Sequence, residues 1–232
     1  MLKLGVPSKG RLMEDAFGWF AARGIRLSRT GSDREYAGAV AGIEGVQLVL
    51  LSAGEIPREL AAGRIHLGVT GSDLIHEKLP DPAAAIPLAP MGFGHADLII
   101  AVPAAWVDVD LLEDLDAACA AFRRDHGFRL RIATKYHRLV RDFLRDNGVA
   151  DYQLVDSQGA TEGTVANLTA EAIADITSSG ETLRANHLKI LRDGMIHASQ
   201  ATLYAARAAD WQGEADRLAR LCQMLGIAPP PL

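Results

Sequence analysis

Residues 172–183 constrain the fold more than any other stretch of this chain. Residues 172–176 are apolar around a single carboxylate, which is typical of a buried strand that reaches the carboxyl edge of a sheet. Residues 177–182 then offer four hydroxyl groups and one glycine before a helix-competent segment. Such a turn directs backbone N–H groups and hydroxyl donors at an anion. The stretch therefore predicts either an anion-binding loop or an ordinary helix start capped by Thr182.

Strand-like and helix-like segments alternate along the rest of the chain, joined by short glycine-containing turns. The expected strands include 2–6, 46–51, 66–70, 86–90, 97–103, 130–134 and 153–156, and the expected longer helices are 13–22, 111–126, 137–147 and 205–225. This alternation predicts an α/β fold with parallel or mixed sheets. Ligands of such sheets bind at the carboxyl ends of the strands, where the anion loop is also expected.

Two glycine-containing joints predict how the chain divides. The joint at 91–96 is flanked by glycines, and we expect the chain to cross there from one lobe to another. Asp193-Gly194 predicts a tight hairpin that joins strands at 188–191 and 195–203. We therefore expect lobe I to comprise residues 1–94 plus 185–232, and lobe II to comprise residues 95–184 with the anion loop.

Charge and composition exclude several classes of protein. The formal net charge of −5 provides no basic field for nucleic acid. Two cysteines cannot form a disulfide framework, so reduced thiols are expected. The first residues contain no apolar signal segment, and no later apolar run is long enough to span a bilayer. We expect a cytoplasmic protein that binds neither nucleic acid nor membranes.

The anion loop resembles the loop that binds 5-phosphoribosyl 1-pyrophosphate (PRPP) in phosphoribosyltransferases, because residues 175–182 read D-x-x-S-S-G-x-T. Further motifs, in the same order along the chain, resemble the ATP phosphoribosyltransferase family. They are PSKGRL at 7–12, EIP at 55–57, LGVTGSD at 67–73, RIATKY at 131–136, GATE at 159–162 and TLRAN at 182–186. The resemblance covers residues 2–205 and rests on the ordered set of motifs.

This resemblance implies a two-lobed α/β fold like that of type II periplasmic binding proteins, with mixed sheets and the active site in the inter-lobe cleft. It implies a pentosyltransferase in which N1 of ATP displaces pyrophosphate from C1 of PRPP, the first step of histidine biosynthesis. The chain resembles the short form of the family. That form implies a homodimer within a hetero-oligomer that contains a regulatory subunit resembling histidyl-tRNA synthetase. Mg²⁺ is the expected cofactor, because hard oxygen ligands such as pyrophosphate suit it.

The resemblance also assigns residues to PRPP. Asp175 is expected to bind the ribose hydroxyls, and Glu171 to replace the acid that the usual loop carries where Ala174 stands. The remaining residues expected to bind PRPP, mainly through its 5′-phosphate, are Ser178, Ser179, Gly180, Glu181 and Thr182.

Catalysis and ATP binding are assigned in the same way. Lys9 and Arg11 are candidates for contacts with pyrophosphate or with the phosphates of ATP. Glu162 is expected either to accept the proton lost after N1 attack or to bind Mg²⁺, a role for which Asp175 is the other candidate. The candidates for ATP binding are Asp73, Lys135 and Tyr136. For Tyr136, packing in the protein interior is an equal alternative to stacking on adenine.

Three departures from the family pattern bear on these roles. Ser52 stands where an arginine is expected, His95 where a small or thiol side chain is expected, and His137 where a proline often follows the tyrosine. Two other functions stay open at this point. A two-lobed protein that binds a small molecule without chemistry would share the fold. A phosphoribosyltransferase with another acceptor base would share the phosphate loop.

Overall fold

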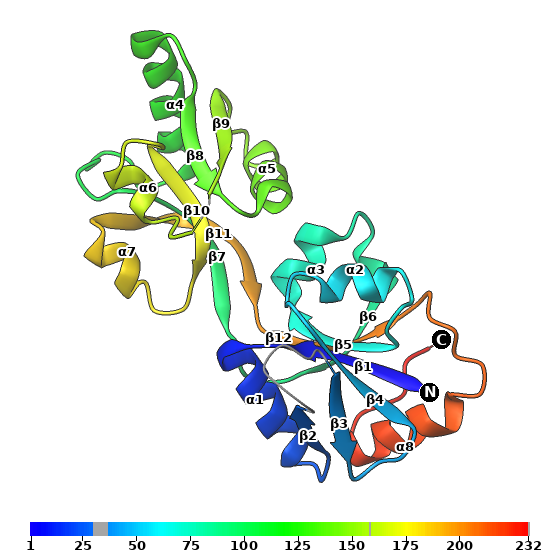
Figure 1. Cartoon of the computed structure of the whole chain (residues 1–232). Helices are drawn as coiled ribbons and strands as arrows, with labels where there is room; N and C mark the ends of the chain where they lie inside the picture. Colours follow the sequence, from blue (N-terminus) through cyan, green and yellow to red (C-terminus); the bar gives the residue numbers. More distant parts are fainter. Residues whose placement is uncertain (30–36, 158, 232) are drawn as a thin grey trace. The chain divides into compact units, whose positions relative to one another are not determined.

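A computed structural model describes residues 1–29, 37–157 and 159–231 of the chain (Figure 1). It divides into two compact units, one formed by Met1–His95 with Ser199–Leu232 and the other by Ala96–Ala198. Of the helices within the described ranges, none is both long enough and apolar enough to cross a lipid bilayer.

The first unit is built on a seven-stranded mixed sheet with the strand order β2-β3-β4-β1-β5-β12-β6. The strands are β1 (Leu2–Pro7), β2 (Arg26–Arg29), β3 (Ala37–Ala41), β4 (Val46–Leu51), β5 (Leu67–Gly71), β6 (Ala85–Pro90) and β12 (Ala201–Ala206). The helices are α1 (Gly10–Ala21), α2 (Ile56–Ala61), α3 (Ser72–Lys78), the short 3-10 helix η1 (Pro82–Ala84) and α8 (Ala215–Leu225). β1 is parallel to β4 and β5, whereas β12 is antiparallel to β5 and β6.

Alternate residues of a strand point to opposite faces of this sheet, and helices pack against both faces. On one face Leu4 of β1 packs with Phe20 of α1 and Leu221 of α8. On the other face Tyr204 of β12 packs with Leu60 of α2. A sheet covered on both faces by helices needs nearly continuous apolar strands, as the sequence pattern predicts.

The second unit is built on a five-stranded mixed sheet with the order β11-β7-β10-β8-β9. Its strands are β7 (Ala96–Pro103), β8 (Leu130–Thr134), β9 (Tyr152–Asp156), β10 (Ala172–Thr177) and β11 (Leu188–Ser199). Its helices are α4 (Leu112–His126), α5 (His137–Asp146), α6 (Gly163–Ala166) and α7 (Glu181–Ala185). β10 is the central strand, parallel to β8 and antiparallel to β7. The stretch that we expected to organise the fold therefore lies in the middle of this sheet.

The hairpin predicted at Asp193-Gly194 is wrong, because β11 runs through both residues. Asp193 Oδ1 instead accepts a hydrogen bond of 2.9 Å from the backbone N–H of Leu112, at the start of α4. A side chain on Gly194 would meet the Ile100 carbonyl oxygen at 3.2 Å, so a close approach of strands also favours the glycine. Because β11 belongs to the second sheet, residues 185–198 lie in the second unit and not in lobe I, where we expected them.

The helix predicted over 205–225 is also shorter than expected. Ala205 and Ala206 belong to β12, where both are fully buried and pair with β6, and α8 begins only at Ala215. Alanine favours helices in isolation, but pairing within the sheet overrides that propensity.

Candidate functional site

The predicted anion loop joins β10 to α7 at the carboxyl end of the central strand of the second unit (Figure 1). Ile173 of β10 is fully buried in a cluster that also contains Leu183 of α7, so apolar packing holds both sides of the loop. Gly180 is buried and has φ of +70°, a left-handed conformation that glycine adopts without steric cost. The local sequence thus forms a tight turn with a fixed entry and exit.

Hydroxyl groups within the loop hold its backbone amides. The N–H of Gly180 donates to Thr177 Oγ1 at 2.9 Å, and the N–H of Glu181 donates to Ser179 Oγ at 3.3 Å. These amides are donors that oxygen atoms of an anion could accept in place of the hydroxyls. Thr177 is a site residue that the sequence reasoning missed, although it is the first hydroxyl of the run.

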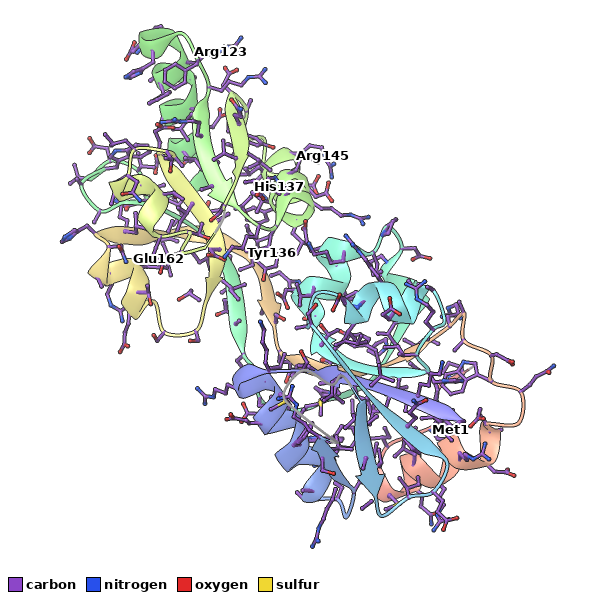
Figure 2. The ribbon with its side chains drawn as sticks, in the orientation of Figure 1. Met1, Arg123, Tyr136, His137, Arg145 and Glu162 are labelled. Carbon is purple, nitrogen blue, oxygen red and sulfur yellow. The ribbon has the colours of Figure 1, made fainter. Side chains whose placement is uncertain are left out.

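A pocket of about 190 Å³ opens beside this loop. It is lined by Glu162, Ile173, Asp175, Ile176, Thr177, Ser178, Ser179, Thr182 and Leu183. Ser178, Ser179 and Thr182 are exposed, which leaves their hydroxyls accessible to a ligand. Figure 2 labels Glu162, which immediately precedes α6. Carboxylates can accept hydrogen bonds from sugar hydroxyls, while hydroxyl and amide donors bind phosphate, so the pocket suits a sugar phosphate.

The structure therefore brings together most of the residues predicted for PRPP. Asp175 is half-buried, and one of its carboxylate oxygens accepts a hydrogen bond of 2.8 Å from the N–H of Ile176. Glu162 reaches the same pocket from a different segment of the chain. Glu181 is exposed at the first position of α7 and does not line this pocket.

Glu171 lies elsewhere, which corrects its predicted role. It precedes β10 at the amino end of the strand, roughly 13 Å from Asp175 at the usual rise of a strand. Its carboxylate accepts hydrogen bonds from Arg131 Nη2 at 2.5 Å, Arg131 Nε at 3.2 Å and the Arg131 N–H at 2.7 Å. The side-chain hydrogen bonding to Glu171 raises the pKa of the Arg131 guanidinium above its usual value. Glu171 is therefore a structural partner of Arg131, and we leave it out of the site.

Lys135 and Tyr136 follow the carboxyl end of β8. Lys135 Nζ donates to the carbonyl oxygen of Gly159 at 2.6 Å, so its ammonium contacts the segment that carries Glu162. Tyr136 is labelled in Figure 2. Its N–H donates to Thr134 Oγ1 at 2.9 Å, and the residue is 7% exposed. The position of both residues beside a strand end is as predicted, and their contact with ATP stays a prediction.

Lys9, Arg11 and Asp73 belong to the first unit. Lys9 is exposed immediately before α1, and the Arg11 side chain is 92% exposed, with Nε 3.6 Å from Asp15 Oδ2. Asp73 is buried in the first turn of α3, where its Oδ1 accepts a hydrogen bond of 2.6 Å from Ser199 Oγ. The structure thus gives Asp73 a bonding role within its own unit, while the two cations stay accessible.

The fit of a divalent metal rests on Glu162 and Asp175. Within residues 1–29, 37–157 and 159–231, no three His, Cys, Asp or Glu side chains are grouped to hold a metal ion. Mg²⁺ is commonly bound by one or two carboxylates together with substrate phosphates and water, without a complete protein cage. Two carboxylates that line one pocket fit a Mg²⁺ ion that arrives with a phosphorylated substrate.

Comparison of the sequence with known proteins gives close matches. A family model described as HisG: ATP phosphoribosyltransferase matches residues 52–226. The ATP phosphoribosyltransferase of Cereibacter sphaeroides is 72% identical over 230 residues, covering 99% of this chain and 98% of the relative. The ATP phosphoribosyltransferase of Rhodopseudomonas palustris strain BisB18 is 51% identical over 219 residues, which cover 94% of this chain and 67% of that longer relative.

Comparison with solved structures bears on the fold. An ATP phosphoribosyl transferase (HisG:HisZ) complex from Thermotoga maritima contains a chain with a TM-score of 0.73 and 20% identity, and the match covers 97% of both chains. A TctC solute binding protein from Polaromonas has a TM-score of 0.52 and 12% identity, with 97% of this chain and 84% of that chain covered. The predicted α/β fold, with mixed sheets like those of periplasmic binding proteins, is confirmed.

Proposed function

The chain belongs to the ATP phosphoribosyltransferase family, and on this premise we propose that it transfers the phosphoribosyl group of PRPP to N1 of ATP, with release of pyrophosphate. This is the first step of histidine biosynthesis. A binding protein without chemistry is not favoured, since the solute binding protein shares 12% identity with the chain, whereas the relative from Cereibacter sphaeroides shares 72%. A different acceptor base is not favoured, because the relative with 72% identity is an ATP phosphoribosyltransferase.

One observation supports the assignment of the phosphoribosyl half of the reaction: Glu162, Asp175 and the hydroxyl-rich loop line a single pocket. The loop residues Ser178, Ser179, Gly180 and Thr182 are assigned to the 5′-phosphate, because hydroxyl and amide donors favour a dianion. Asp175 precedes the loop on β10 and is assigned to the ribose hydroxyls, which donate to its carboxylate.

The chemistry needs charge stabilisation and alignment more than it needs a nucleophile on the protein. The bond from C1 to pyrophosphate oxygen breaks with its electron pair as the bond from adenine N1 to C1 forms. Positive charge develops on the ribose ring, and nearby carboxylates can stabilise it. Glu162 is assigned as the acceptor of the proton that the adenine loses. Lys9 and Arg11, both exposed cations, are assigned to the leaving pyrophosphate.

Mg²⁺ is the proposed cofactor. Glu162 or Asp175 would hold it together with oxygen atoms of PRPP, and the ion would offset the negative charge of the pyrophosphate. Lys135, Tyr136 and Asp73 stay assigned to ATP as predictions. For Glu181 we propose a role in PRPP binding only through its backbone N–H, which belongs to the loop.

Assembly and location are also proposed. The Thermotoga maritima structure is a HisG:HisZ complex, and its matched chain agrees with this one over 97% of both lengths. The presence of a second kind of subunit in that complex supports a hetero-oligomer. We further propose that this chain forms a homodimer within it and that the regulatory subunit resembles histidyl-tRNA synthetase. A cytoplasmic location is inferred from the substrates, because ATP and PRPP are made there.

The test is a calorimetric titration of PRPP in the presence of Mg²⁺, with the wild-type chain and with the variants Asp175→Asn and Thr182→Val. Each variant should lower the affinity about tenfold or more, because a hydrogen bond to a charged group contributes about 1.5–3 kcal/mol. Thr169→Val is the matched control, since Thr169 is exposed and its hydroxyl donates to the Thr164 carbonyl outside the pocket. It should bind PRPP as the wild type does.

Turnover separates the enzyme from a binding protein. Addition of ATP, with the regulatory subunit present, should release pyrophosphate from PRPP and form phosphoribosyl-ATP. Binding of PRPP without release of pyrophosphate would favour the binding-protein alternative. Wild-type affinity in both Asp175→Asn and Thr182→Val would contradict the assignment of the pocket.

A further inference from the structure

Arg184, which the proposed mechanism does not use, reaches back from α7 to the phosphate loop. Its Nη2 donates a hydrogen bond of 3.1 Å to the carbonyl oxygen of Ser179. Its backbone N–H donates to the carbonyl oxygen of Gly180 at 3.0 Å. One residue therefore binds two successive carbonyl groups of the loop.

The peptide between Ser179 and Gly180 is held at both of its polar ends. Its carbonyl oxygen accepts from the Arg184 guanidinium, and its N–H donates to Thr177 Oγ1 at 2.9 Å. A carbonyl oxygen carries partial negative charge, so a peptide turned the other way would present that charge to an incoming phosphate. The guanidinium provides a charge-assisted hydrogen bond that favours the orientation in which the oxygen faces the arginine.

The glycine at 180 also fits this arrangement. Its φ of +70° disfavours any residue with a side chain. In addition, a Cβ at this position would lie 3.1 Å from Arg184 Nη1, which is closer than ordinary van der Waals contact. A residue other than glycine would therefore both strain the loop and displace the guanidinium.

Arg184 does not line the proposed PRPP pocket. It lines a second pocket of about 290 Å³, together with Asp97, Ile99, Thr177, Ser178, Ser179, Gly180, Ile190, Leu191, Arg192 and Met195. The two pockets share only the loop residues Thr177, Ser178 and Ser179. Glu162 and Asp175 line the first pocket and not the second. Arg184 is thus placed to hold the loop without touching a ligand in the first pocket.

We propose that Arg184 is a positioning residue that sets the phosphate loop in its binding conformation before the 5′-phosphate arrives. It does so by fixing the peptide between Ser179 and Gly180 and by placing a positive charge behind the loop. This inference rests on the proposed function, since it takes the loop to be the site of the 5′-phosphate. It adds a residue that acts through the loop and makes no contact with substrate.

The test compares Arg184→Gln and Arg184→Lys with Arg192→Gln, a matched control that removes the same charge from the same second pocket. Three probes are titrated: PRPP with Mg²⁺, ribose 5-phosphate, and pyrophosphate with Mg²⁺. Arg184→Gln should weaken PRPP and ribose 5-phosphate about tenfold alike, because both carry the 5′-phosphate, and should leave pyrophosphate unchanged. Arg184→Lys, which keeps the charge, should recover part of the loss. Arg192→Gln should change each affinity by about twofold at most.

A measurement without substrate keeps the inference separate from the proposed function. Hydrogen exchange of the Gly180 amide in the ligand-free chain should be about tenfold faster in Arg184→Gln and unchanged in Arg192→Gln. Gly180→Ala combined with Arg184→Gln should lower the affinity for ribose 5-phosphate less than the sum of the two single changes, because both act on the same contact.

Equal losses for pyrophosphate and ribose 5-phosphate, or an unchanged amide exchange rate in Arg184→Gln, would overturn the inference. If the wild-type chain binds neither PRPP nor ribose 5-phosphate, the proposed function fails. The exchange measurement then still decides whether Arg184 holds the loop.

Discussion

The ion pair between Arg131 and Glu171 provides a prediction that separates a structural residue from a ligand-binding one. Arg131 makes three hydrogen bonds to the Glu171 carboxylate, through its N–H, Nε and Nη2, while Nη2 also donates to the Leu168 carbonyl at 3.0 Å. The two side chains are 30% and 15% exposed, so solvent screens the pair only in part. The perturbation is Glu171→Gln, which keeps the shape of the side chain and removes its charge.

The magnitude follows from this geometry. Fully exposed pairs contribute about 0–1 kcal/mol, and hydrogen bonds to charged groups in the interior contribute about 1.5–3 kcal/mol. For a pair of intermediate exposure we expect Glu171→Gln to lower the free energy of unfolding by about 1–2 kcal/mol. In a chain of this size that loss corresponds to a fall in the melting temperature of roughly 2–8 °C.

Thermal unfolding and calorimetric titration of PRPP measure the two consequences on the same samples. Glu171→Gln should melt earlier and bind PRPP as the wild type does. Asp175→Asn is the matched control on the same strand and should show the reverse pattern, with lower affinity and a nearly unchanged melting temperature. A Glu171→Gln variant that keeps its melting temperature and loses PRPP affinity would refute the reasoning and restore the ligand-binding role that the sequence suggested.

Three further changes have consequences that the structure defines. Asp193→Ala should lower the free energy of unfolding by about 1 kcal/mol and speed hydrogen exchange in the first turn of α4, since Asp193 caps that helix; unchanged exchange there would contradict the capping role. Gly63→Ala should cost about 2 kcal/mol or more in a urea titration, because φ is +65° and a Cβ would lie within 2.4 Å of the Ala208 carbonyl oxygen. Burial raises the pKa of the Cys119 thiol to about 12, so a thiol reagent at pH 8 should label Cys119 only after unfolding. Rapid labelling of the native chain would show that Cys119 is not buried. Since the thiol ionises near pH 9.0 in the unfolded chain, the free energy of unfolding should fall as the pH rises from about 9 to about 12.

Much of the second unit could be predicted from local patterns. The apolar run of β10, the hydroxyls after it and Gly180 identified a strand, a turn and a helix start, and the structure contains all of them. Hydrophobic periodicity and turn residues carry this information, because both depend only on residues that are close together in the sequence. The ordered motifs identified the family from the same local stretches, and the comparisons agree with that identification.

Local propensity predicts the wrong element where it competes with contacts to distant segments. Asp193-Gly194 reads as a hairpin, but the start of α4 binds the aspartate and the strand continues. The alanines after Leu203 read as a helix, but they pair with β6 in the first sheet. In each case a contact with a distant segment, helix α4 for Asp193 and strand β6 for the alanines, contributes more than the local preference. The sequence does not state which distant segments meet.

The site shows the same division. Local sequence was enough to predict that residues 177–182 form a loop rich in donors, because neighbouring residues build it. Which acids face that loop depends on long-range packing, which local sequence does not reveal. The segment before α6 brings Glu162 to the pocket of Asp175. The parallel register of β10 with β8 places Glu171 against Arg131. The contact of Arg184 with the loop depends on both kinds of information. Arg184 is only five residues from Ser179 in the sequence, and the left-handed conformation of Gly180 between them accompanies the return of the guanidinium to the Ser179 carbonyl.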